Sequence, residues 1–427
     1  MTNQWIAPWN VSAAFAPALT TLEWALLLGV AAFVGQGVQR LTGLPKVLGY
    51  AAVGALAGLA GLAGATWPLR GVGLFLLELG IAVVLFEAGA RLPLRWFRHN
   101  PMVLVQSAAE SLLTFMAAYV ALHALGLDVK VVRALSVIAV ASSPAVLMRV
   151  VADLRANGPV TDRAVALTTL NTLYALTLGT AMLRTIDRGE GTMLASLAFS
   201  LTVLGVSALV GVVLAAVLTA AMRGLQATSE DCAIVILAGV AACVSAATPL
   251  GGSAPLAALL AGLALKQVHP RPWVWPRQLG TAATVLSIVM FVLVSAMAVR
   301  GQWSWSITGT VLALIAVRAG AKVSSLLATG FGTGMALRQT LWVSATLVPM
   351  SAVALLLTSQ FVKASHSVGT QVAAIALPVI LVTELLGAVM VSVALVRAGE
   401  AAAPWRRRKA DATDATTGAA ADGEARP

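Results

Sequence analysis

The stretch that decides the fold, GVGLFLLELGIAVVLFEAGARL, runs from Gly71 to Leu92 and carries charges only at Glu78, Glu87 and Arg91. A helix needs about 20 apolar residues to cross the hydrocarbon core of a bilayer. Comparable apolar runs recur along the chain, separated by short charged or turn-forming segments. Helices satisfy their own backbone hydrogen bonds in lipid, so this pattern predicts an all-α polytopic membrane protein.

The composition excludes a water-soluble fold. Of the 427 residues, 59% are hydrophobic and 11% charged, and the mean hydropathy is +0.90; a soluble domain has about 25% charged residues. The net charge of +11 comes from basic residues that are spread through short loops, so we expect a lipid bilayer and no nucleic acid as partner. The four histidines do not have the spacing of a metal site, and no histidine is predicted to lie at the same membrane depth as a candidate serine nucleophile. The sequence therefore predicts no metal, no cofactor and no enzyme.

Thirteen transmembrane helices are predicted, near residues 21–40, 45–64, 71–92, 101–126, 131–152, 163–184, 192–222, 229–247, 252–267, 280–299, 304–329, 338–360 and 369–397. An odd number places the termini on opposite sides. Basic residues gather on one set of loops if the N-terminus is outside, which the positive-inside rule favours. We expect residues 1–399 to form the membrane domain of a cytoplasmic (inner) membrane protein of bacterial type, and residues 400–427 to form a disordered cytoplasmic tail.

Ionisable side chains within membrane helices are costly and usually functional. Glu87 can pair with Arg91 one turn away, which favours a structural role. Arg318 and Lys322 share a helix face one turn apart, so they need anions nearby. The other ionisable residues predicted to lie deep in the membrane are Glu78, Glu110 and Glu384.

Two prolines interrupt apolar helices at matching places. Pro144 lies in ASSPA, residues 141–145, and Pro349 lies in LVPMS, residues 347–351. Each would lie in the middle helix of a three-helix group. Inverted repeats with one broken helix each are the pattern by which secondary transporters build a site at the membrane midplane.

Five segments in order resemble the monovalent cation:proton antiporter superfamily, in its Kef-like (sodium/hydrogen exchanger) branch. They are LPKVLGY at 44–50, ELG through FEAG at 78–89, SSP at 142–144, GS through AG at 252–262, and Lys322. The resemblance implies a homodimer of scaffold helices with mobile cores, formed by residues 101–184 and 304–397 and moving like elevators. It also implies that the two broken helices cross at the ion site, through Ser142, Ser143, Pro144, Pro349 and Ser351.

The chain departs from the family pattern where the family has its ion-binding aspartate. Asn171 and Thr172 stand at the family's Asn-Asp pair, and Ser351-Ala352 stands where the family has Gly-Glu. Asparagine and threonine can offer oxygens to a cation but cannot release a proton. We therefore expect Glu110, in the core, to supply the missing negative charge. The candidate ion- and proton-binding residues are Asn171, Thr172, Lys322 and Glu110, and the candidate charge partners are Arg318, Glu384 and Glu78.

These features predict a secondary active transporter that exchanges Na⁺ or K⁺ for protons at an atypical site. Two alternatives stay open. One is a carrier of the same fold that has lost proton coupling and moves another solute, such as an anion attracted by Lys322 and Arg318. The other is a membrane partner or sensor that transports nothing.

Overall fold

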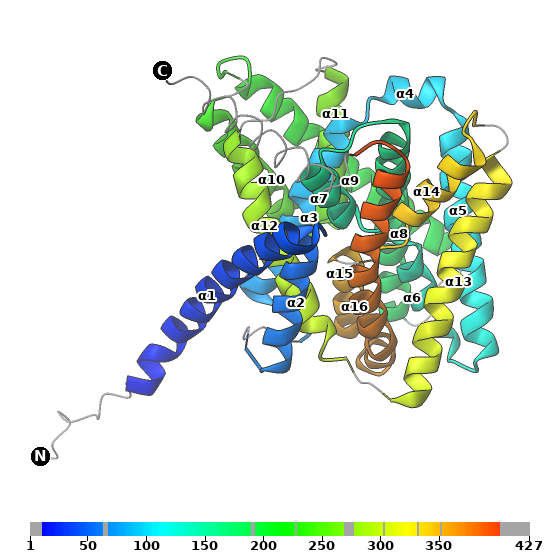
Figure 1. The fold of residues 1–427 in the computed structure, drawn as a ribbon, viewed down its shortest axis with the longest axis horizontal. Coiled ribbons are helices and arrows are strands. Elements are labelled where there is room, and N and C mark those ends of the chain that lie inside the picture. The colour runs from blue at the N-terminus through cyan, green and yellow to red at the C-terminus, as the bar shows by residue number, and fades with distance from the viewer. Residues whose placement is uncertain are drawn as a thin grey trace, which may run out of the picture.

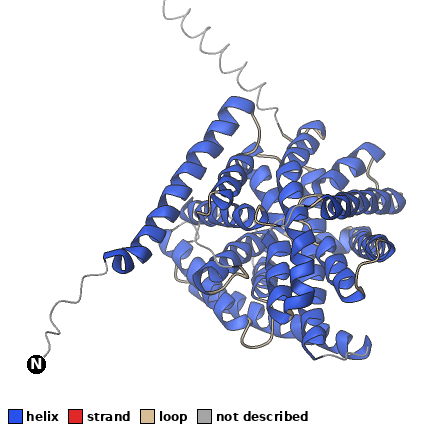
Figure 2. Ribbon diagram, turned by 90° about the horizontal axis from the view of Figure 1, so that it is seen from below, coloured by secondary structure: helices blue, strands red, loops and turns tan. Residues whose placement is uncertain are grey.

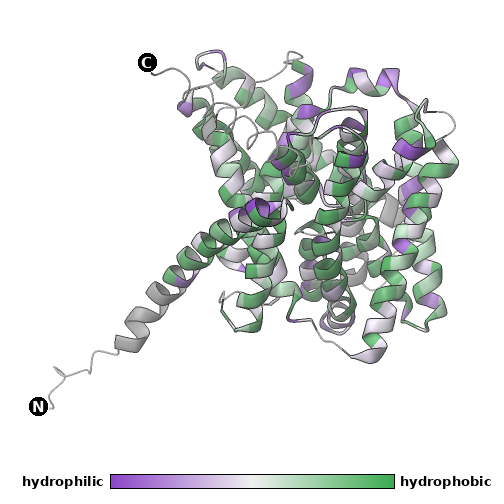
Figure 3. Ribbon diagram, in the orientation of Figure 1, coloured by the Kyte–Doolittle hydropathy of each residue, from purple (hydrophilic) through white to green (hydrophobic). Residues whose placement is uncertain are grey.

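Every regular element in the part of the chain described by the computed structural model is a helix (Figures 1 and 2). The described residues are 11–62, 67–188, 193–226, 229–268, 277–301, 304–330, 333–350 and 352–401. The predicted all-α membrane fold is confirmed. Ten segments of these residues are long and apolar enough to cross a membrane, and α2, α11 and α15 are shorter apolar helices. Hydrophobic residues colour most of the ribbon in Figure 3.

The helices follow the predicted apolar runs, with one addition and two breaks. They are α1 (Val11–Thr42), α2 (Lys46–Leu59), α3 (Gly71–Arg91), α4 (Leu94–His99), α5 (Met102–Ala124), α6 (Val129–Val140), α7 (Pro144–Leu154), α8 (Pro159–Arg188), α9 (Met193–Ala221), α10 (Glu230–Ala247), α11 (Ala254–Val268), α12 (Arg277–Ala298), α13 (Trp305–Gly330), α14 (Leu337–Thr346), α15 (Ala352–Ala364) and α16 (His366–Arg397). The added helix is the short α4. The predicted segments 131–152 and 338–360 are the pairs α6/α7 and α14/α15.

Glycines allow the first group of helices to pack closely. A Cβ on Gly262 of α11 would lie 2.2 Å from the backbone oxygen of Phe86 in α3, and one on Gly89 would lie 2.4 Å from the oxygen of Leu259. Gly54 of α2 meets the backbone of α12 in the same way. Small residues that let backbones approach are the usual means of helix packing in membranes. Helices α2, α3, α11 and α12 therefore form one tightly packed group.

The second group holds both broken helices. Helix α6 ends at Val140 and α7 begins at Pro144, whose missing N–H costs nothing at the first helical position. The Ser143 hydroxyl accepts a hydrogen bond from the Val146 N–H at 3.2 Å and so caps α7. The second break, between α14 and α15, contains Pro349; Ser351, predicted to belong to this crossing, lies outside the described residues.

The two breaks touch each other. The Ser143 N–H donates to the Pro349 oxygen at 2.9 Å, and the Ser142 hydroxyl donates to the Leu347 oxygen at 2.9 Å. The four half-helices α6, α7, α14 and α15 all pack against both α8 and α16. The predicted crossing is therefore present in the described residues.

Both ends of the chain differ from the prediction: the first helix begins at Val11 instead of near residue 21, and Glu400 has defined hydrogen-bond partners. Helix α1 projects from the body (Figure 1) and exposes apolar side chains such as Phe33, which is 81% accessible. Glu400, predicted to begin a disordered tail, instead caps α8: its carboxylate accepts from the Val160 N–H at 2.6 Å and the Thr161 N–H at 2.7 Å. A helix N-terminus attracts an anion, which explains this contact. The rest of the predicted tail, residues 402–427, lies outside the described residues.

Candidate functional site

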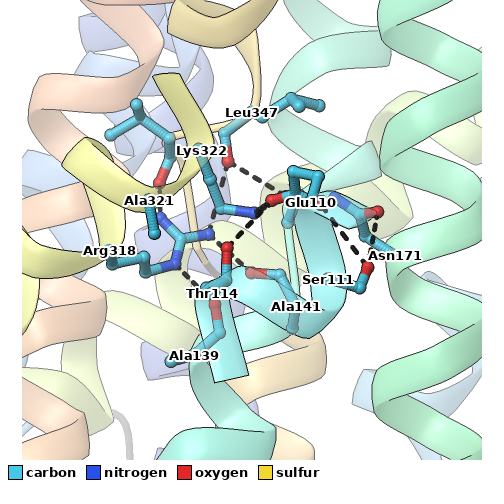
Figure 4. Close-up of polar contacts among 12 residues, drawn as sticks. Glu110, Ser111, Thr114, Ala139, Ala141, Asn171, Arg318, Ala321, Lys322 and Leu347 are labelled. Atoms are coloured by element: carbon cyan, nitrogen blue, oxygen red, sulfur yellow. Dashed lines mark hydrogen bonds and ion pairs between the residues drawn. The ribbon is translucent and has the colours of Figure 1, made fainter. Parts of the chain in front are cut away.

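A buried ion pair lies beside the crossing. Glu110 of α5 and Lys322 of α13 are both fully buried, and the lysine Nζ contacts the glutamate Oε1 directly (Figure 4). The same Nζ donates to the Ser142 Oγ in the α6/α7 break at 3.1 Å. Helices α5 and α13 pack side by side along their lengths, which brings the two residues together. Burying two charges costs several kcal/mol per ion, so the pair persists only because further hydrogen bonds support it.

Hydroxyl groups of α5 supply some of that support. The Thr114 hydroxyl donates to the Glu110 Oε1 at 3.2 Å, and the Ser111 hydroxyl lies 3.4 Å from Oε2. Ser107, Glu110, Ser111 and Thr114 recur at spacings of three and four, which places them on one helix face. That face is buried, so α5 presents a polar stripe to the interior of the body.

Asn171 and Thr172 of α8 complete a cluster of oxygens around the pair. The Asn171 Oδ1 accepts from the Ser111 hydroxyl at 3.1 Å and from the Ser107 hydroxyl at 3.4 Å. The Asn171 amide reaches the Ser142 Oγ at 3.4 Å. The Thr172 hydroxyl donates to the Thr168 carbonyl at 2.8 Å and lies 3.3 Å from the Ser142 carbonyl. Carboxylate, carbonyl and hydroxyl oxygens are the ligands that hard cations prefer.

Arg318 lies at the negative ends of both interrupted half-helices. Its guanidinium donates to the carbonyls of Ala139 at 2.7 Å and Ala141 at 2.6 Å, where α6 ends. It also donates to the carbonyls of Leu347, at 3.3 Å, and Val348, where α14 ends. The last carbonyls of a helix lack intrahelical partners and carry partial negative charge. Arg318 therefore holds the two breaks together through backbone oxygens (Figure 4).

Glu384, a candidate charge partner, contacts neither Arg318 nor Lys322. In the described residues, the guanidinium binds carbonyls and the ammonium binds Glu110 and Ser142. Glu384 of α16 is fully buried and accepts instead from the Ser295 hydroxyl of α12 at 3.1 Å. The reason is helix rotation: α16 turns Gly387 toward Pro349 and Glu384 toward α12. Glu78 also lies away from the pair, half-buried in α3.

The structure thus gathers most of the predicted site. Glu110, Lys322, Ser142, Asn171 and Thr172 form one connected network. Ser107, Ser111 and Thr114 belong to it as well and were not predicted. Their spacing of three and four from Glu110 is a signal that could have identified them.

A family model described as "Sodium/hydrogen exchanger, transmembrane" matches residues 28–397. The chain belongs to the sodium/hydrogen exchanger family. Membership makes it a multi-pass membrane protein of a transporter family, not an enzyme. Among proteins with curated descriptions, none matches this sequence.

Two solved structures of one sodium proton antiporter share the fold. The chain is similar to the sodium proton antiporter MjNhaP1 from Methanocaldococcus jannaschii at pH 8, with a TM-score of 0.68, 15% identity, and coverage of 89% of this chain and 98% of that one. For a second structure of MjNhaP1, from an electron microscopy map, the TM-score is 0.66, the identity 16%, and the coverage 90% and 94%. At these identities the likeness supports the predicted antiporter fold alone.

Proposed function

We propose that this member of the exchanger family moves a monovalent cation, Na⁺ or K⁺, in exchange for protons, and that Glu110 replaces the aspartate missing from α8. One observation carries the proposal: the fully buried Glu110 carboxylate, paired with a lysine, lies among neutral oxygens where the two broken helices meet. Crossed half-helices bring helix ends, with their partial charges, to membrane depth, which suits a site for a small ion.

The proposed exchange is a competition for Glu110. In the proton-loaded state the Lys322 ammonium balances the carboxylate, as in the described contacts. A cation that enters the oxygen cluster takes over this role, and Lys322 gives up its proton to water. The charge of the site is the same before and after, because one positive charge replaces another. A site built this way exchanges one cation for one proton.

Movement of the site between the two sides requires the crossing to stay intact. Arg318 ties the ends of α6 and α14 to α13, and Lys322 lies one turn further along the same helix. We expect α5–α8 and α13–α16 to move as one core against the other helices. We further propose a homodimer in a cytoplasmic membrane, with the N-terminus outside, as the loop charges favour.

The anion-carrier alternative is less well supported by these contacts. An anion would need a cationic side chain that is free to bind it. In the described residues both cations of α13 already have oxygen partners: Lys322 has a carboxylate and Arg318 has four carbonyls. No particular contact favours a role without transport.

Proteoliposomes test the proposal. The purified protein is reconstituted with a pH-sensitive dye inside, and Na⁺, K⁺ or Li⁺ is added outside over a range of pH. We expect proton efflux on cation addition in the wild type and in Glu87→Gln, which changes a carboxylate of a surface ion pair. Glu110→Gln and Lys322→Ala should lose the exchange while the protein remains folded. Wild-type rates in Glu110→Gln, or no exchange with any cation in folded wild type, would refute it.

A further inference from the structure

Glu384 is a second fully buried carboxyl that the proposed exchange does not use. It lies in the middle of α16, and in the described residues one of its oxygens accepts a hydrogen bond from Ser295 while the other has no partner. Ser295 is fully buried as well. In the described residues, no hydrogen bond connects the Glu110 network to the Glu384 carboxyl.

The Ser295 to Glu384 bond joins the two groups of helices. Ser295 belongs to α12, which packs mainly on α2 and α3; the next residue, Ala296, has its backbone oxygen only 2.4 Å from where a Cβ on Gly58 of α2 would lie. Glu384 belongs to α16, which packs mainly on α13, α14 and α15 and on both halves of the first broken helix. The bond therefore crosses the boundary along which the proposed core would slide.

No cation neutralises Glu384 in the described residues. The ionisable side chains on the helices packed against α16 are Lys46 and Tyr50 of α2, Lys130 and Arg133 of α6, Arg149 and Asp153 of α7, Arg318 and Lys322 of α13, Arg338 of α14, and Lys363 of α15. In the described residues, none of these forms an ion pair or hydrogen bond with Glu384. Arg277 of α12 is 18 residues from Ser295, about five helical turns away.

An ionised carboxylate in such a place is unfavourable. Isolated buried charges cost far more than one hydroxyl hydrogen bond returns, so a buried group of this kind neutralises instead. A neutral carboxyl still accepts from Ser295 through its carbonyl oxygen and needs only one further acceptor for its own proton. The lack of a neutralising cation in the described residues therefore favours the protonated form over the ionised one.

We propose that Glu384 is a second proton-binding group of the transport cycle, protonated while α16 lies against α12. When the core moves and the contact with Ser295 opens to water, the O–H bond of the carboxyl breaks, the proton passes to water, and a carboxylate remains. The cation-loaded return stroke carries the carboxylate back, and a proton from water on the first side then reloads it. This inference rests on the proposed exchange function, because that function supplies the movement.

The consequence is a change in stoichiometry. The Glu110 and Lys322 pair alone exchanges one proton for one cation and moves no net charge. A second proton on Glu384 makes each cycle move one net charge, so the membrane potential drives the wild-type exchange. Glutamine has the shape and neutral charge of a protonated glutamate, so Glu384→Gln should keep the fold and lose only this proton.

The first test is independent of transport. Infrared spectra of purified protein at neutral pH should contain the carbonyl band of a buried protonated carboxyl in the wild type, Glu110→Gln and Glu87→Gln. The band should be absent from Glu384→Gln and shifted in Ser295→Ala, which removes the hydrogen bond. Identical bands in the wild type and Glu384→Gln would overturn the proposal.

The second test measures charge movement. A potential imposed across proteoliposomes with a potassium ionophore should change the rate of Na⁺-driven exchange in the wild type but not in Glu384→Gln, which should still exchange. Potential dependence that persists in Glu384→Gln overturns the proposal. Absence of any exchange in the wild type refutes the proposed function instead, and the infrared difference then decides proton binding at Glu384 by itself.

Discussion

Separating the two members of the buried pair should damage stability more than removing both. Glu110→Gln leaves the Lys322 ammonium fully buried with Ser142 as its remaining partner. Breaking a buried pair in this way costs about 3 to 5 kcal/mol, mostly for the uncompensated charge. Glu110→Gln combined with Lys322→Met removes both charges while keeping similar volumes. Replacing a whole buried pair with neutral groups is often neutral or stabilising.

We therefore expect the double variant to be more stable than Glu110→Gln, with a coupling energy of about 2 to 3 kcal/mol in a double-mutant cycle. The assay is the free energy of unfolding in detergent micelles, titrated with a denaturing detergent. Glu87→Gln is the control, because its pair with Arg91 is exposed and such pairs contribute about 0 to 1 kcal/mol. A double variant no more stable than Glu110→Gln would refute the reasoning. Neither Glu110→Gln nor the double variant should exchange ions.

Three further predictions concern packing, capping and the crossing. Gly262→Ala places a Cβ 2.2 Å from the Phe86 backbone oxygen and should destabilise the protein by about 1 to 3 kcal/mol. Gly205→Ala, whose Cβ would meet no atom beyond its own stretch of helix within 4 Å, should be neutral or slightly stabilising in a thermal-shift assay. Truncation after residue 399 removes the Glu400 cap of α8 and should cost about 0.5 to 2 kcal/mol; truncation after residue 401 keeps the cap, and equal stability of the two would contradict this role. Arg318→Lys cannot reach four carbonyls on two half-helices and should lower stability by about 1 to 3 kcal/mol, so an unchanged melting temperature would show that the guanidinium contacts do not matter.

The helices could be predicted because the signal is local. Long apolar runs have few alternatives in lipid, and Pro144 and Pro349 mark positions where a helix loses a hydrogen bond. Sequence reasoning can also predict that Glu110 pairs with Lys322, for a similar reason. A buried charge needs a partner, and few candidates exist at membrane depth.

The partners of Arg318 and Glu384 could not be predicted in the same way. Arg318 binds backbone carbonyls, which every residue has, so no side chain in the sequence points to them. Glu384 meets Ser295 because of how α16 is rotated against α12, and long-range packing sets that rotation. The Glu400 cap depends likewise on where the end of α16 meets the start of α8.

The most direct test of the central claim is calorimetric titration of the purified protein with Na⁺ and with K⁺, in buffers that differ in ionisation enthalpy. This measurement counts the protons released when a cation binds, without any need for transport. The account predicts that binding to the wild type releases a proton and that Glu110→Gln neither binds the cation nor releases a proton. Cation binding without proton release, or unchanged binding in Glu110→Gln, would contradict a competition between the cation and the Lys322 ammonium for Glu110.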